Sequence, residues 1–181
     1  MNVRSLAVLG LLLLTIPPAT ARVKGKNMDA YNVIWDSPSK DSSGSMPMGN
    51  GDIGANVWVE ENGDLVFYIS KTDAWGGDGE LKKLGRVRIS LTPSLVGKDM
   101  PFRQELKLQQ GEIAIKSGDV SMLFWIDANH PVIHVEAQSP NPFTAKCVLK
   151  MWRPDTMLSD KADRIVWCQR NTNSLFPETL T

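Results

Sequence analysis

The ten residues Met46-Pro47-Met48-Gly49-Asn50-Gly51-Asp52-Ile53-Gly54-Ala55 carry the most information in this chain. Gly49 and Gly51 can take backbone angles that other residues avoid, so the chain can turn sharply here. Asn50 and Asp52 have short polar side chains that can bond to nearby backbone groups. An alternating apolar run starts directly afterwards, so the stretch predicts an ordered turn that leads into a strand. A second interpretation, that the stretch is a family signature, depends on the rest of the chain.

Alternating apolar residues dominate the sequence on both sides of this turn. Ile53, Ala55, Val57 and Val59 alternate with polar or aromatic residues, and the alternation resumes after Asn62-Gly63 at Leu65, Phe67 and Ile69. Two such runs around an Asn-Gly pair predict a β-hairpin. Further strands are predicted over residues 31–35, 86–91, 106–108, 113–115, 120–126, 132–137, 143–153 and 164–169, with a loop over residues 36–45.

These short strands, separated by turn residues, favour an all-β fold, and we expect one antiparallel β-sandwich domain. No segment shows sustained helical periodicity. In the long strand over residues 143–153, the alternation predicts that Phe143, Ala145, Cys147, Leu149 and Met151 face inward. The last residues, Leu175 to Thr181, contain no closing strand, so we expect the sandwich to be incomplete at this end.

The first 21 residues have the pattern of a secretory signal peptide. Arg4 precedes the apolar run Leu6 to Ile16, and Ala19-Thr20-Ala21 is a typical cleavage site. The run is too short for a transmembrane helix, which needs about 20 apolar residues. We therefore expect residues 22–181 to be exported to the periplasm or secreted, with no membrane anchor.

The charges are balanced, with 20 basic and 20 acidic residues. Nucleic acids and anionic lipid surfaces select a clustered basic face, which the composition does not indicate, so we expect neither as a partner. The two cysteines, Cys147 and Cys168, each lie in a predicted strand. An export compartment permits a disulfide between them, and two buried free thiols are the equal alternative.

Candidate functional residues are few. Trp75 follows a predicted strand and precedes two glycines, a place where exposed binding residues are common, whereas most of the six tryptophans are expected in the core. Asp52, Asp73 and Asp127 could supply the two carboxylates of a glycosidase, although each also fits an ordinary turn. His130, His134 and Glu136 do not form a compact ligand set, so we expect no metal and no cofactor.

Taken in order, several segments resemble the N-terminal β-sandwich of glycoside hydrolase family 95, the α-L-fucosidases. Trp35 and Pro38 precede the Pro-apolar-Gly-Asn-Gly motif at residues 47–51, and Asp73 and Trp75 precede two glycines as in that family. The stretches 102–111 and 125–136 resemble its later strands. The sequence departs from the family at Asp52, where a basic residue is usual, and at residues 71–73. It therefore resembles an uncharacterised bacterial offshoot.

The resemblance implies a supersandwich-like domain that packs on an (α/α)6 barrel further along the same polypeptide. In that family the barrel holds the catalytic residues, so none is expected in this chain. Asn50, Asp52, Asp73 and Trp75 would then contact carbohydrate or the barrel. Two alternatives stay open at this point: a free-standing carbohydrate-binding module, and a truncated fragment without function.

Overall fold

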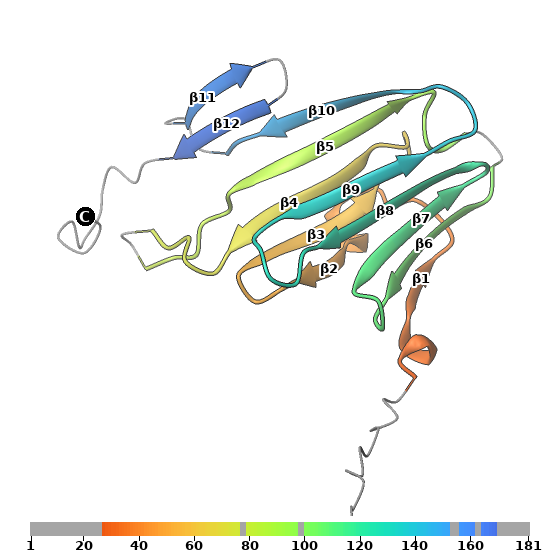
Figure 1. Cartoon of the computed structure of the whole chain (residues 1–181), viewed down its shortest axis with the longest axis horizontal. Coiled ribbons are helices and arrows are strands. Elements are labelled where there is room, and N and C mark those ends of the chain that lie inside the picture. Colours follow the sequence, from red (N-terminus) through yellow and green to blue (C-terminus); the bar gives the residue numbers. More distant parts are fainter. Residues whose placement is uncertain (1–26, 77–78, 98–99, 153–155, 162–163, 170–181) are drawn as a thin grey trace, which may run out of the picture.

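The computed structural model describes residues 27–76, 79–97, 100–152, 156–161 and 164–169. Two five-stranded antiparallel sheets stack face to face, and β1 and β10 lie on opposite sides of the molecule (Figure 1). The predicted antiparallel β-sandwich is confirmed.

The first sheet has the strand order β1-β6-β7-β8-β9. It consists of β1 (Val33–Trp35), β6 (Phe102–Lys107), β7 (Glu112–Ser117), β8 (Val120–Ile126) and β9 (Ile133–Gln138). The second sheet has the order β10-β5-β4-β3-β2. It consists of β10 (Thr144–Lys150), β5 (Gly85–Thr92), β4 (Leu65–Lys71), β3 (Ile53–Val59) and β2 (Met46–Gly49). A separate hairpin pairs β11 (Thr156–Lys161) with β12 (Arg164–Gln169), and two short 3-10 helices, η1 (Asp29–Tyr31) and η2 (Ser42–Gly44), flank β1.

The hairpin predicted around Asn62-Gly63 is confirmed as β3 and β4, whose last pair joins Val59 to Leu65. Gly63 has a φ of 87°, and a Cβ atom there would lie 2.2 Å from the hydroxyl oxygen of Ser94. Only glycine fits both the backbone angle and the available space, so the turn type and the register of the hairpin follow from this residue.

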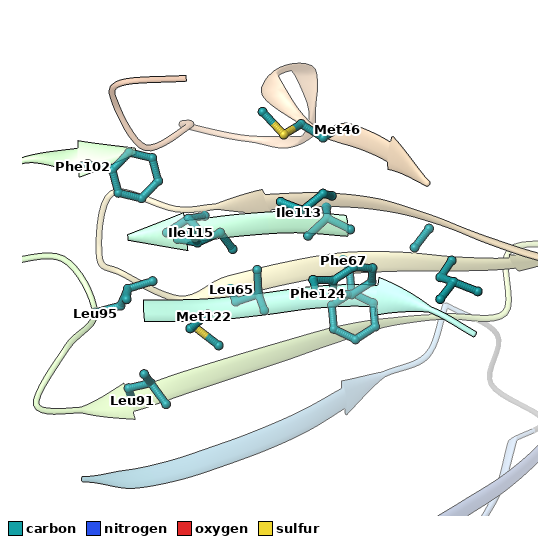
Figure 2. Close-up of a cluster of buried hydrophobic side chains, with 14 of the residues drawn as sticks. Met46, Leu65, Phe67, Leu91, Leu95, Phe102, Ile113, Ile115, Met122 and Phe124 are labelled. Carbon is teal, nitrogen blue, oxygen red and sulfur yellow. The ribbon is translucent and has the colours of Figure 1, made fainter. Parts of the chain in front are cut away.

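The core lies between the two sheets and contains apolar side chains from both. Alternate residues of β3 and β4 point inward and meet alternate residues of β7 and β8 (Figure 2). Phe67 and Phe124 contact each other edge to face across the two layers, with ring centroids 5.1 Å apart. The two sheets are also linked by Gln104, which is 2% exposed and whose side-chain amide donates to the Val57 carbonyl at 3.3 Å.

The structure corrects three predictions of local structure. Met46–Gly49 form β2 and pair with β3, so the turn in the opening stretch is confined to residues 50–52. Tyr31 belongs to η1, and the first strand begins at Val33. The strand β11, which sequence patterning did not indicate, pairs with β12 over residues 164–169, where a strand was predicted.

A further correction concerns β10, which is shorter than predicted and whose predicted inward residues are not buried. Phe143, Ala145 and Cys147 are exposed, and Leu149 is only partly buried. Because β10 is the edge strand of the second sheet, these exposed side chains show that the first sheet does not cover it. Alternation predicts which side a residue faces, but it does not predict whether a second layer covers that side.

Residues 1–21, predicted as a signal peptide, and residues 175–181 lie outside the described part of the chain. Among the helices that the structure does describe, none has the length and apolar character needed to cross a bilayer.

Candidate functional site

Asn50 lies in the turn between β2 and β3 and uses all of its side-chain hydrogen-bonding groups within the chain. Its side-chain oxygen accepts from the backbone N–H groups of Asp52 and Ile53, each at 2.9 Å. Its amide nitrogen donates to the carbonyl oxygens of Asp127 at 2.8 Å and His130 at 3.0 Å, in the turn between β8 and β9. An Asn amide has two donor hydrogens and one oxygen with two lone pairs. The side chain therefore ties the second sheet to the first.

Lys71, at the end of β4, brings two of the predicted site residues together. Its ammonium nitrogen lies 2.9 Å from a carboxylate oxygen of Asp52 and 2.6 Å from one of Asp73. The Thr72 N–H also donates to the Asp52 carbonyl at 2.9 Å, which holds the two segments side by side. The hydrogen bond from Lys71 lowers the pKa of Asp73, and the bonds to Asp73 and Asp52 raise the pKa of Lys71.

Trp75 follows this ion pair and is 55% exposed. Its indole N–H donates to the Thr72 carbonyl at 2.8 Å, and its backbone N–H donates to the Asp73 carbonyl at 2.9 Å. These two bonds hold Trp75 against the backbone of residues 72 and 73, while a large part of its ring surface stays in contact with solvent.

The turn after β8 adds a third carboxylate, Asp127. One carboxylate oxygen accepts from the backbone N–H groups of Asn129 at 2.8 Å and His130 at 2.9 Å, and it lies 3.0 Å from Nδ1 of His130. The N–H of Asn129 and then the ring of His130 lower the pKa of Asp127. This turn adjoins the Asn50 turn through the two bonds that Asn50 donates.

These residues form one surface at the end of the sandwich, which we call the loop end. It comprises Asn50, Asp52, Lys71, Asp73, Trp75, Asp127 and His130. All four predicted site residues lie here: Asn50, Asp52, Asp73 and Trp75. The side-chain amide of Asn50 links the two sheets, and both of its N–H groups are used in doing so. Lys71 and His130 were not predicted as members, and only their proximity in the folded chain reveals them.

The pKa values of two carboxylates of the loop end, Asp73 and Asp127, are shifted away from the range that suits an acid catalyst. A general acid in glycoside hydrolysis needs a raised pKa so that it holds its proton near neutral pH. The pKa values of Asp73 and Asp127 are both lowered, by Lys71 and by backbone N–H groups respectively. The arrangement can accept hydrogen bonds from a polar ligand and stack an apolar ring face on Trp75.

A second feature was missed by sequence reasoning. The outer face of the second sheet, which points away from the core, has a hollow of about 450 Å³ beside Tyr68 and Lys83. Tyr68 and Asn56 are cross-strand neighbours in β4 and β3, and both belong to the polar-facing positions of the predicted hairpin. The alternation of residues along the two strands could have placed both on this face. It could not have predicted the contacts that they make there.

The remaining candidate residues lie apart from the loop end. His134 stacks on Trp125 with ring centroids 4.7 Å apart, and no group of three or more potential metal ligands occurs in the described ranges. Cys147 is exposed rather than buried. The side chain of Cys168 lies outside the described part of the chain, so the disulfide between the two stays a prediction.

The fold and the loop end define a two-layer β-sandwich domain with a polar, tryptophan-bearing surface at one end. A family model described as a domain of unknown function, DUF5703, in its N-terminal part, matches residues 34–176, and the chain belongs to this family. The match runs from β1 to beyond β12 and so includes every strand of the sandwich. No curated protein matches the chain.

Proposed function

We propose that this chain is the non-catalytic N-terminal β-sandwich domain of an exported bacterial glycoside hydrolase-like protein, similar to the α-L-fucosidases, that acts in carbohydrate degradation. In this proposal the loop end contacts carbohydrate, alone or together with an (α/α)6 barrel of the same polypeptide. The order of the sequence motifs supports the family relationship, and the chemistry of the loop end supports the ligand class.

The observation that carries the proposal is the exposed indole of Trp75, which follows Asp73 by two residues in the loop after β4. Tryptophan rings stack on the C–H faces of sugar rings, and carboxylates accept hydrogen bonds from sugar hydroxyl groups. Trp75 is 55% exposed, and its bond to Thr72 holds the ring in place before any ligand arrives. A ring that is already ordered loses less conformational entropy on binding, which favours affinity.

The proposal assigns no catalytic residue to this chain. The salt bridges of Lys71 occupy Asp52 and Asp73, and backbone N–H groups stabilise the ionised form of Asp127. These environments suit hydrogen-bond acceptors that position a sugar. Bond cleavage would then belong to groups elsewhere in the full protein.

Calorimetric titration with fucosylated oligosaccharides, together with quenching of tryptophan fluorescence, tests this function. We expect Trp75→Ala to weaken binding about tenfold, the loss that corresponds to one stacking contact. Trp35→Ala is the matched control, because Trp35 is 41% exposed and its indole N–H also donates to a backbone carbonyl, that of Gly44 at 3.1 Å. No binding by the unmodified chain, or an equal loss in both variants, would contradict a sugar-binding loop end.

A free-standing carbohydrate-binding module is the alternative that the same exposed indole favours. The reading frame downstream of the Thr181 codon separates the two. A continuing frame with helical periodicity supports the domain of a larger enzyme, whereas a stop codon together with binding by the isolated chain supports the module.

A further inference from the structure

The outer face of the second sheet carries one row of residues that crosses all five strands. Cross-strand pairing places these residues opposite one another in turn, and they are Pro47, Asn56, Tyr68, Arg86 and Lys150. Residues directly opposite one another in antiparallel strands point to the same side of the sheet. The opposite side of the same strands packs into the core, so this row faces away from it.

Aromatic rings form the centre of this face. The ring of Tyr68 contacts Trp58 edge to face at 5.0 Å and Trp152 edge to face at 5.3 Å. Trp58, a diagonal neighbour of Tyr68 on the same face, is 2% exposed, whereas Trp152 is 43% exposed. The ammonium group of Lys83 lies over both outer rings, 5.7 Å from the centroid of Tyr68 and 5.6 Å from that of Trp152.

Four of the cations on this face have no carboxylate partner in the described part of the chain. Lys83, Arg86, Lys146 and Lys150 all lie on it, and within the described ranges none of the four makes an ion pair with Asp or Glu. Arg88, two residues along β5 from Arg86, shows the contrast, because Glu60 and Asp64 both pair with it. Although the chain as a whole is balanced in charge, the fold places four uncompensated positive charges on one sheet face.

A hollow of about 450 Å³ adjoins the aromatic centre. Small-molecule sites usually occupy about 300–1,000 Å³, so this hollow is large enough for a ligand. Gly49 and Gly54 form part of its floor and have no side chains to fill it, while Asn56, Ser70, Tyr68 and Lys83 line it with an amide, a hydroxyl, a ring and an ammonium group. A Cβ atom on Gly54 would lie 3.0 Å from the Ser70 hydroxyl oxygen and would narrow the hollow.

We propose that this face is a second binding site, distinct from the loop end, for an acidic glycan, a chain of sugar rings that carry carboxylate or sulfate groups. The unpaired cations would bind the anionic groups, and the polar lining of the hollow would bind hydroxyl groups of one ring. Charge complementarity excludes a neutral polysaccharide as the preferred ligand. This proposal does not rest on the function proposed for the loop end.

A nucleic acid strand is the competing polyanion, and the geometry favours the glycan over it. Single-stranded nucleic acids bind by stacking their bases on exposed aromatic faces. Here Lys83 lies over the faces of Tyr68 and Trp152, so a base would have to displace it. A carboxylate or sulfate group, in contrast, can pair with Lys83 where it stands.

Binding of the full chain to oligogalacturonate, measured by calorimetry at low salt, tests the proposal, and dextran sulfate replaces the carboxylate with sulfate. The methyl ester of the same oligogalacturonate removes the charge but keeps the sugar backbone. We expect at least one of the two anionic glycans to bind about tenfold more tightly than the ester. We also expect Lys83→Gln and Arg86→Gln each to weaken that binding about tenfold, as for the loss of one hydrogen bond to a charged group.

Lys116→Gln is the matched control, since Lys116 is an exposed lysine in β7 of the first sheet and its loss changes the net charge equally. Three results would overturn the proposal: no binding of either anionic glycan, equal losses in the Lys83 and Lys116 variants, or tighter binding of a single-stranded DNA of equal charge. Trp75→Ala should leave this binding unchanged, so failure at one site is distinguishable from failure at the other.

Discussion

The side-chain amide of Asn50 donates a hydrogen bond of 2.8 Å to the backbone carbonyl of Asp127, and so joins a turn of the second sheet to a turn of the first. A second bond from the same nitrogen reaches the carbonyl of His130. The asparagine of the Gly-Asn-Gly motif therefore has a structural role that does not depend on any ligand. This asparagine sets the relative position of the two turns that carry the loop end.

Replacing Asn50 with Ala should destabilise the domain by about 2–3 kcal/mol, because four hydrogen bonds are lost and the Asp127 carbonyl loses the amide that donates to it, whereas the His130 carbonyl keeps the Val132 N–H. Urea denaturation followed by fluorescence would measure the change. Asn62→Ala is the control, since Asn62 makes a local side-chain bond to the backbone of Asp64 in an exposed turn and should cost less than about 1 kcal/mol. Equal losses in the two variants would contradict the tying role of Asn50.

Arg88 should contribute more to stability than the other surface cations. Its guanidinium group makes two bonds to the carboxylate of Glu60, at 2.8 and 2.9 Å, and a third to Asp64. These bonds connect β5 to the turn of the Asn62-Gly63 hairpin, because Glu60 and Asp64 lie between β3 and β4. We expect Arg88→Lys to cost about 1–2 kcal/mol, since an ammonium group cannot reproduce the paired geometry.

The measurement for Arg88 is the same denaturation experiment, with Arg86→Lys as the control on the same strand. Arg86 has no carboxylate partner in the described part of the chain, so its conservative replacement should be close to neutral. A loss for Arg88→Lys that is no larger than the loss for Arg86→Lys would show that the pairs with Glu60 and Asp64 contribute little.

The stability of the domain should fall in acid partly because of Asp127. Its folded-state pKa is lowered from 3.8 by the N–H of Asn129 and by His130. A lowered pKa stabilises the fold at pH values above the unfolded-state pKa, and this contribution is lost as the pH falls through the lower, folded-state value. Asp127→Asn should therefore flatten the decline of unfolding free energy below pH 4, measured by urea titrations between pH 2 and pH 6.

An Asp29→Asn variant supplies the comparison for the acid experiment, because Asp29 lies in η1, which precedes β1, three strands along the first sheet from β8. Its profile should follow that of the unmodified chain. If the stability profile of Asp127→Asn coincided with that of the unmodified chain from pH 2 to pH 6, Asp127 would not contribute to the loss of stability in acid.

Ser117 is fully buried, and its hydroxyl oxygen has no hydrogen-bond partner among the described residues. Removing an unpaired buried hydroxyl avoids its desolvation cost while it deletes only one atom. We therefore expect Ser117→Ala to raise the unfolding free energy by up to about 1 kcal/mol, measured as a higher midpoint temperature. Destabilisation of similar size would show that the hydroxyl is bonded in solution, for example to water.

The fold was predictable because its signals are local. The Asn62-Gly63 turn and the alternation on either side of it define β3 and β4, and similar alternation predicts most of the other strands. The strand β2 was missed because Pro47 and Gly49 disfavour strands, yet pairing with β3 outweighs that tendency. The exposure of Cys147 could not be predicted, because it depends on how far the first sheet extends.

The candidate site was predictable only in part, for a related reason. Trp75 and Asp73 stand beside glycines after a strand, and that local pattern is visible in the sequence. The position of Lys71 between Asp52 and Asp73 depends on the pairing of Ile53 with Lys71, which unites residues far apart along the chain. The cations of the outer face come from β5, β10 and the segment before β5. Because they lie on one face only in the folded chain, the balanced overall charge does not indicate them.

The position of β10 has a further consequence for the behaviour of the protein in solution. Within the described ranges, no strand pairs with its outer edge, and it presents exposed apolar residues such as Val148 there. Such an edge can recruit strands from other molecules and start aggregation, and lysines on it oppose this. Lys146 and Lys150 stand at alternate positions of β10, so replacing both with neutral residues is expected to lower solubility before it lowers stability.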